Sequence, residues 1–257
     1  MKFQNNNSYN LTGQVALITG SSKGIGKACA LALAEAGADI VLGLHDISSA
    51  RALVKQIEKL GRKVLAVQMD VSNMDQISSA VATAHKHFKR IDILVNNTGI
   101  GAASPAEDVS EQDFDATIAV NLKGTFFVSQ AVGRIMIRQR RGRIINIGSQ
   151  AGFVALPTEA VYCMTKAAIS HLTKCLALEW AVYNITVNAV APTFIETPGT
   201  KKWLDDEEFR ASVKRRIPLG RIGKPEDVAR PVVFLASAAA SMMTGATLMI
   251  DGGWTIQ

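Results

Sequence analysis

The chain has 257 residues, of which 48% are hydrophobic and 19% are charged, and these proportions fit one globular domain. No apolar run is long enough to span a membrane, and residues 1–8 lack the apolar run of a signal peptide. Cys29, Cys163 and Cys175 are widely spaced and fit no metal-binding pattern, so we expect reduced thiols in a cytoplasmic protein without a metal.

Short β-rich segments alternate with helical segments along the chain. The predicted strands are almost continuously apolar, which is typical of parallel strands covered on both faces, and they span residues 15–19, 40–44, 64–69, 91–96, 143–147, 186–190 and 247–250. Apolar residues at helical spacing predict helices over about 25–36, 49–60, 74–88, 111–140, 161–183 and 225–237. This order predicts a single-domain α/β fold over 11–257, a doubly wound parallel sheet of about seven strands with helices on both faces, preceded by a polar tail over 1–10.

The segment 194–216 is longer than an ordinary connection between a strand and a helix. It carries Trp203, then four acidic residues (205–208), then three basic residues (214–216). Acid followed by base suits one short helix whose dipole is complemented at both ends. We therefore expect a mobile lid over a substrate site.

The net charge of +6 raises the question of a nucleic-acid partner. The densest basic cluster comprises Arg138, Arg140, Arg141 and Arg143. It falls where a helix ends, and cations there complement the helix dipole without any partner. We expect neither nucleic acid nor a membrane as a partner.

A glycine-rich turn follows the first predicted strand. Gly20, Gly24 and Gly26 lie between that strand and the first helix. Glycines allow a pyrophosphate to approach the backbone, and a helix N-terminus presents free N–H groups to it. The segment is a candidate dinucleotide site, although its spacing differs from G-x-G-x-x-G.

Two side chains of the helix over 161–183 predict acid/base chemistry. Tyr162 and Lys166 are four residues apart, so they project from the same helix face, and Ser149 precedes Tyr162 by thirteen residues. An ammonium beside a phenol favours the phenolate, so we expect Lys166 to lower the pKa of Tyr162 toward neutrality.

Taken in order and spacing, these motifs resemble the short-chain dehydrogenase/reductase family, whose domain is Rossmann-like. The resemblance runs from about residue 11 to 254 and rests on Thr19-Gly20-(x)3-Gly24-Ile25-Gly26, Asp70-Val71, Asn96-Asn97-Thr98-Gly99, Asn121, Ser149, Tyr162-(x)3-Lys166 and Pro192 to Thr197. Thr98 and Thr193 depart from the family's usual alanine and glycine. The resemblance implies an NAD(P)-dependent oxidoreductase that interconverts a secondary alcohol and a ketone by hydride transfer.

The resemblance also implies roles for individual residues. Tyr162 would donate and accept the proton, Lys166 would bind the nicotinamide ribose, Ser149 would hold the substrate oxygen, and Asn121 would anchor a water. The implied coenzyme-binding residues are Gly20, Ser22, Lys23, Gly24, Ile25, Gly26, Asp46, Asp70, Val71, Asn97, Gly99, Tyr162, Lys166, Pro192, Ile195 and Thr197.

The choice of coenzyme depends on two of these positions. Leu44 occupies the family's usual acid position, and Asp46, two residues later, could still reach a ribose hydroxyl of NAD. Lys23 favours the 2′-phosphate of NADP, so we expect NADP(H) slightly ahead of NAD(H).

The substrate class and assembly follow from the resemblance alone. Trp203 and Asp251-Gly252-Gly253-Trp254 resemble family members that act on sugars, sugar acids and polyols, and a 3-oxoacyl thioester reductase is the alternative. A nucleotide-binding scaffold without turnover is an alternative of another class, against which the intact Ser149, Tyr162 and Lys166 argue. We expect a homotetramer, formed through the helices over 111–140 and 161–183.

Overall fold

The computed structural model describes residues 8–256, so most of the tail expected over 1–10 lies outside the described residues. Seven parallel strands form one sheet in the order β3-β2-β1-β4-β5-β6-β7. These strands are β1 (Val15–Thr19), β2 (Asp39–Leu44), β3 (Val64–Gln68), β4 (Ile93–Asn96), β5 (Gly142–Ile147), β6 (Ile185–Pro192) and β7 (Thr247–Ile250). The predicted doubly wound α/β sheet is confirmed.

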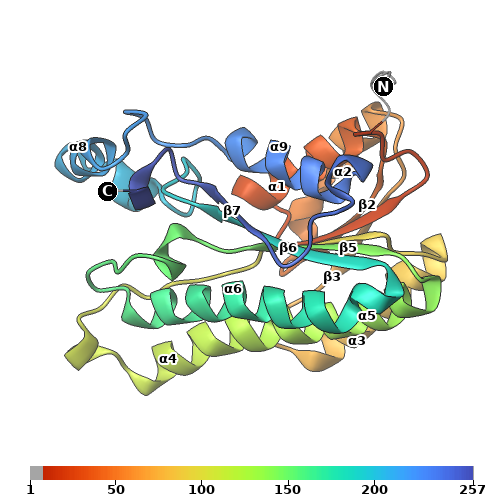
Figure 1. The fold of residues 1–257 in the computed structure, drawn as a ribbon, viewed down its shortest axis with the longest axis horizontal. Helices are drawn as coiled ribbons and strands as arrows, with labels where there is room; N and C mark the ends of the chain where they lie inside the picture. Colours follow the sequence, from red (N-terminus) through yellow and green to blue (C-terminus); the bar gives the residue numbers. More distant parts are fainter. Residues whose placement is uncertain (1–7, 257) are drawn as a thin grey trace.

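Helices cover both faces of the sheet (Figure 1). One face carries α1 (Gly24–Glu35), α2 (Arg51–Lys59) and α9 (Pro225–Ala236), and the other carries α3 (Met74–Phe88), α4 (Glu111–Ile118), α5 (Thr125–Gln139) and α6 (Ala160–Trp180). Each face has its own apolar core. The central strands are therefore apolar on both sides, which explains their continuous hydrophobic runs.

The helix expected over 111–140 is not continuous. It is interrupted by a π-helical turn, Ala119–Gly124, which separates α4 from α5. Gly124 packs against the turn that follows β3, because a Cβ atom there would approach the carbonyl oxygen of Val71 to 2.7 Å. Turns of this kind widen a helix locally and are frequent at functional sites.

The segment expected to hold one short helix contains two. α7 (Lys201–Leu204) carries Trp203, and α8 (Glu207–Arg215) has the acid-then-base order that the sequence predicted. A third apolar cluster holds the segment to the C-terminal residues and comprises Leu204, Val213, Ile217 and Ile222 with Phe194 and Trp254 packed on it. Figure 1 places α8 and the C-terminus together at one end of the molecule.

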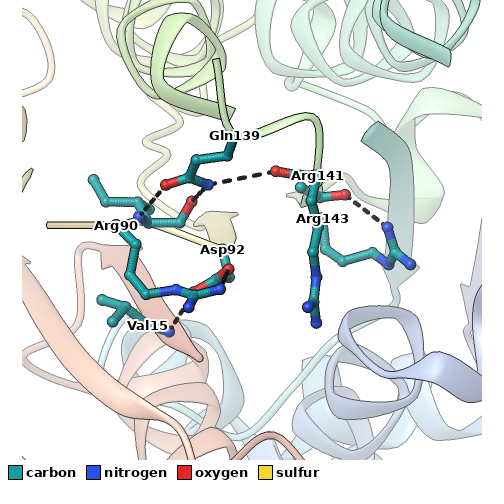
Figure 2. Close-up of polar contacts among 8 residues, drawn as sticks. Val15, Arg90, Asp92, Gln139, Arg141 and Arg143 are labelled. Carbon is teal, nitrogen blue, oxygen red and sulfur yellow. Dashed lines mark hydrogen bonds and ion pairs between the residues drawn. The ribbon is translucent and has the colours of Figure 1, made fainter. Parts of the chain in front are cut away.

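A buried carboxylate joins the amino ends of the central strands (Figure 2). Asp92 is 1% exposed and accepts two hydrogen bonds from Arg90, at 2.7 and 2.6 Å, and one from the backbone N–H of Val15 at 3.0 Å. Gln139, at the end of α5, exchanges two hydrogen bonds with the backbone of Ile91. These contacts fix β1, β4 and α5 at the edge opposite the glycine turn.

The basic cluster at the end of α5 has local contacts. The guanidinium of Arg143 donates to the carbonyl oxygen of Gly142 at 2.9 Å, and that of Arg140 lies 5.7 Å from the ring centroid of Tyr183. None of the helices in the described part of the chain is long and apolar enough to cross a bilayer.

Candidate active site

The predicted site residues gather at the carboxyl ends of the strands. Strand order reverses between β1 and β4, and ligands of such sheets bind in the crevice at this point. The coenzyme candidates lie on the turn into α1 (Gly20, Ser22, Lys23, Gly24, Ile25, Gly26), after β2 (Asp46), β3 (Asp70, Val71) and β4 (Asn97, Gly99), at the end of β6 (Pro192) and in the loop that follows it (Ile195, Thr197).

The glycine turn forms a cradle in which side chains have no room. Gly20 and Gly24 have φ values of +61° and +55°, a region that favours glycine. A Cβ atom on Gly26 would lie 2.4 Å from the carbonyl oxygen of Gly20. Lys23 precedes α1, and within residues 8–256 no side chain caps this helix end. The cradle therefore fits a pyrophosphate, with free N–H groups of the helix facing it.

The end of β4 is bound to this turn. Asn97 donates its side-chain N–H to the carbonyl oxygens of Thr19 and Gly20, at 3.0 and 3.1 Å. The hydroxyl of Thr19 accepts from the backbone N–H groups of Asn97 and Thr98. Thr98, one of the two departures from the family pattern, fills the space beside Gly20. Asn97 thus shapes the cradle, and Thr19, which belongs to the glycine motif but was assigned no role, supports it.

Two acidic candidates are already engaged with local partners. Asp46 accepts from the backbone N–H and hydroxyl of Ser48, at 2.9 and 2.8 Å, and these hydrogen bonds lower its pKa. Burial raises the pKa of Asp70, but hydrogen bonds from Ser72 and the charge of His45 outweigh burial and lower it. Asp46 therefore serves as the cap of a 3-10 turn, a role that its position two residues after Leu44 did not reveal.

The loop after β6 reaches back to the glycine turn. A Cβ atom on Gly24 would lie 3.2 Å from the side chain of Thr197. Ile195 is 3% exposed and pairs with Gly223 in an isolated parallel bridge. The hydroxyl of Thr193, the second departure, is buried and has no hydrogen-bond partner among the described residues. The loop thus closes one side of the cradle.

The four catalytic candidates come from three separate elements. Ser149 follows β5, Tyr162 and Lys166 lie on α6, and Asn121 lies in the π-helical turn. The hydroxyl of Ser149 is close enough to that of Tyr162 to lower the pKa of the phenol by hydrogen bonding. The ammonium of Lys166 lies 5.5 Å from the ring centroid of Tyr162. These side chains therefore converge at the carboxyl end of β5, on the same edge of the sheet as the cradle.

The π-helical turn delivers Asn121 to this cluster. Its side chain accepts from the N–H of Ile100 and donates to the carbonyl oxygen of Ile100, both at 2.9 Å, and donates to the hydroxyl of Thr165 at 3.0 Å. A Cβ atom on Gly99 would lie 3.3 Å from Nζ of Lys166 and 3.4 Å from Oδ1 of Asn121. Thr165 is buried and ties Asn121 to α6, and no motif in the sequence indicated it.

The electrostatics differ from the sequence expectation. Burial raises the pKa of Tyr162 to about 12, the hydrogen bond with Ser149 lowers it, and the charges of Glu159 and Cys163 raise it further. Burial also lowers the pKa of Lys166 to about 8. The ammonium donates to the carbonyl oxygen of Ile147 at 2.9 Å rather than to the phenol. The expected lowering of the Tyr162 pKa by Lys166 is wrong for the coenzyme-free protein, because desolvation raises this pKa and the charge of Lys166 is not among the influences on it.

Residues 8–256 contain no group of three or more histidine, cysteine, aspartate or glutamate side chains arranged to hold a metal ion. The chemistry of the cluster is that of a hydroxyl pair, an ammonium and an amide, beside a cradle for an anionic nucleotide.

Comparison with known proteins agrees with this geometry. A family model described as enoyl-(acyl carrier protein) reductase matches residues 20–255. A relative named NAD-dependent glycerol dehydrogenase, from Listeria innocua, is 43% identical over 97% of this chain and 96% of its own length. A 3-oxoacyl-(acyl-carrier-protein) reductase from Thermotoga maritima is 45% identical over 96% of this chain and 99% of its own.

A solved structure of similar fold is that of a gluconate 5-dehydrogenase from Burkholderia cenocepacia J2315, in complex with NADP and tartrate. It is 39% identical, superposes with a TM-score of 0.94, and covers 98% of both chains. The glycine cradle, the cluster at the end of β5 and these full-length similarities lead to one conclusion. The chain belongs to the short-chain dehydrogenase/reductase family of NAD(P)-dependent oxidoreductases that act on CH–OH groups.

Proposed function

We propose that this protein interconverts a secondary alcohol and a ketone in sugars, sugar acids or polyols, with Tyr162 as the general acid/base. The observation that carries the proposal is the convergence of Ser149, Tyr162, Lys166 and Asn121 beside the glycine cradle. Relatives named for glycerol and gluconate support the substrate class.

In the proposed oxidation, Ser149 and Tyr162 bind the hydroxyl of the substrate. Tyr162 accepts the hydroxyl proton while the carbinol carbon loses a hydride, so the alcohol becomes a ketone. The bound nicotinamide supplies the acceptor of that hydride, and the donor in the reverse direction. Lys166 would hold the nicotinamide ribose, and its ammonium would favour the phenolate of Tyr162.

The proton has a route away from Tyr162 that begins at Lys166. Nζ of Lys166 and Oδ1 of Asn121 flank Gly99 from the same side. Asn121 would anchor a water between Lys166 and solvent. The pKa of Lys166, lowered to about 8 by burial, suits a group that passes protons near neutral pH.

For the coenzyme, we propose that NADP(H) is bound slightly better than NAD(H). The carboxylate of Asp46 already accepts two hydrogen bonds from Ser48, so it is less available to accept one from a ribose hydroxyl. Lys23 is exposed at the N-terminus of α1, where a 2′-phosphate could reach it. Replacing Lys23 by methionine should weaken NADPH binding about tenfold and leave NADH binding within twofold, as measured by nucleotide fluorescence. Equal losses for both nucleotides would contradict the assignment.

Replacement of Tyr162 by phenylalanine tests the catalytic proposal. The variant keeps the ring but lacks the hydroxyl that donates and accepts the proton, so turnover should fall by at least a thousandfold. The dissociation constant for NADPH should change by no more than a few-fold. A variant that retains near-normal turnover would end the assignment.

A second candidate is reduction of 3-oxoacyl thioesters, favoured by the 45% identical relative of that name. The same residues would act in the reverse direction. Steady-state rates with NAD(H) and NADP(H) on polyols, sugar acids and 3-oxoacyl thioesters would separate the two candidates.

We also propose a homotetramer in the cytoplasm. Apolar side chains are exposed on α5 and beside the end of α6, where Leu178 is 82% and Val182 is 68% exposed, and Phe126 is 39% exposed. Such a surface is typical of a subunit interface. The three cysteines are all unpaired thiols, which fits a reducing compartment. Light scattering of the purified protein should give four times the monomer mass.

A further inference from the structure

Glu159 is a carboxylate in the active site that no motif assigns. It directly precedes α6 and stands three residues before Tyr162. A Cβ atom on Gly101 would lie 3.2 Å from Oε2 of Glu159 and 3.3 Å from Cδ2 of Tyr162. The carboxylate and the phenol ring therefore face the same small space over Gly101.

The carboxylate of Glu159 lacks a partner in this position. It does not cap α6, and within residues 8–256 neither a hydrogen bond nor an ion pair within 4 Å reaches it. Glu159 is half-buried, and burial raises its pKa while the charge of Lys202 lowers it. A half-buried carboxylate beside the reacting tyrosine, with both oxygens free to accept, is open to hydrogen-bond donors from a ligand.

The nearby cations are largely engaged elsewhere. Lys202, on α7, lies 4.2 Å from the ring centroid of Trp203. Its neighbour Lys201 forms an ion pair with Asp205 at 2.6 Å. Lys202 thus lowers the pKa of Glu159 through its charge, without forming a close ion pair with it.

An ionised carboxylate accepts hydrogen bonds and donates none. The hydroxyl groups that flank the reacting carbon of a polyol or an uncharged sugar can donate to it. A sugar acid would bring a second negative charge close to Glu159, where the surrounding protein screens charges less than water does. An acyl chain would offer no donor and would leave the carboxylate desolvated.

We propose that Glu159 makes the site selective for uncharged polyols and sugars over sugar acids and acyl thioesters. This inference rests on the proposed function, since it concerns the substrate of the same site. Glu159 is a specificity residue, which binds a hydroxyl adjacent to the one that Tyr162 deprotonates.

The test compares kcat/KM for a four-carbon neutral polyol and for D-gluconate at one pH and ionic strength. The full-length wild type should favour the polyol at least tenfold. Glu159→Gln keeps the shape of the side chain and removes its charge, so the ratio should move at least tenfold toward gluconate. Glu179→Gln is the matched control, because Glu179 is an exposed carboxylate on the same helix, and its ratio should stay within twofold of the wild type.

Lys202→Met provides an independent variant at an exposed position. Loss of this cation should strengthen the discrimination against gluconate about threefold. A wild type that prefers gluconate or a 3-oxoacyl thioester would overturn the inference. So would an unchanged ratio in Glu159→Gln, or faster gluconate turnover in Lys202→Met.

The outcomes also separate this inference from the proposed function. If the wild type binds NADPH but turns over no alcohol or ketone, or if Tyr162→Phe stays active, the proposed function fails. If Tyr162→Phe is inactive and the wild type is active, but Glu159→Gln retains the wild-type ratio, the role of Glu159 alone fails.

Discussion

Replacing Lys166 by methionine should stabilise the coenzyme-free protein at pH 7. Lys166 is 3% exposed, and burial lowers its pKa from 10.5 to about 8. One pKa unit corresponds to about 1.4 kcal/mol, so keeping this ammonium charged at pH 7 costs about 3 kcal/mol. Methionine is similar in length and uncharged, but it loses the 2.9 Å hydrogen bond to Ile147. That bond offsets about 1–2 kcal/mol, which leaves a net gain of roughly 1–2 kcal/mol.

The pH dependence gives this prediction a second, independent signature. Between pH 8 and 10.5 the unfolded lysine keeps its proton while the folded one releases it, so the unfolded state binds more protons. The stability of the wild type should therefore rise with pH across this window. Tyr162 acts in the opposite sense, because its pKa is raised from 10.0 to about 12 and stability is lost as pH rises through 10 to 12. Measurements between pH 7 and 9.5 avoid the tyrosine.

The assay is thermal unfolding of coenzyme-free wild type and Lys166→Met at one protein concentration, since assembly shifts the midpoint. For a chain of this size 1 kcal/mol shifts Tm by about 2–4 °C, so the variant should melt about 2–8 °C higher at pH 7. Its Tm should also rise less between pH 7 and 9.5 than that of the wild type. Turnover should be nearly abolished, as expected when a stabilising change removes a desolvated functional group.

Two results would refute this reasoning. One is a variant that melts below the wild type at pH 7, which would mean that the hydrogen bond to Ile147 outweighs desolvation of the charge. The other is an unchanged pH slope, which would mean that a different group titrates in this window.

Two further predictions concern the cradle and the opposite edge of the sheet. Gly26→Ala should weaken NADPH binding at least tenfold and lower stability by about 1–3 kcal/mol, because its Cβ would lie 2.4 Å from the Gly20 carbonyl oxygen. Gly199→Ala is the control, because the nearest atom to its Cβ would be 3.6 Å away. Equal nucleotide affinity in both variants would contradict the assignment of the glycine turn as the coenzyme site. Asp92→Asn should lower stability by about 1–3 kcal/mol, seen as a reduced Tm, because the negative charge and one of the two oxygens that accept from Arg90 are lost. Turnover per folded molecule should not change at 25 °C, and a loss of turnover would show that this edge affects the site.

Local sequence patterns were sufficient to predict the architecture of the sheet and its helices. The apolar runs of the strands arise because both faces of the sheet are covered, and the helix positions follow from 3.6-residue spacing. The glycine turn could also be predicted from the sequence. A positive φ at Gly20 and Gly24 and close backbone packing at Gly26 restrict those positions to glycine. The pairing of Tyr162 with Lys166 on one face needed helical geometry alone.

Other features of the site depend on contacts between distant segments. The π-helical turn at Asn121 leaves no mark in the helical spacing, yet it joins that residue to Ile100 and Thr165. The sequence suggested that Asp46 could reach a ribose hydroxyl, but its carboxylate accepts hydrogen bonds from the backbone N–H and hydroxyl of Ser48.

The sequence by itself determined the fold, the family and the set of reactive groups, because each rests on spacing along the chain. The tertiary structure decided how those groups are tuned. A cation one helical turn away predicted a lowered pKa for Tyr162, but burial raises it to about 12 and lowers that of Lys166 to about 8. Glu159 likewise lies beside Tyr162 over Gly101 only in the folded chain. Desolvation and proximity depend on which distant segments pack together, so they cannot be predicted from residues that are adjacent in the sequence.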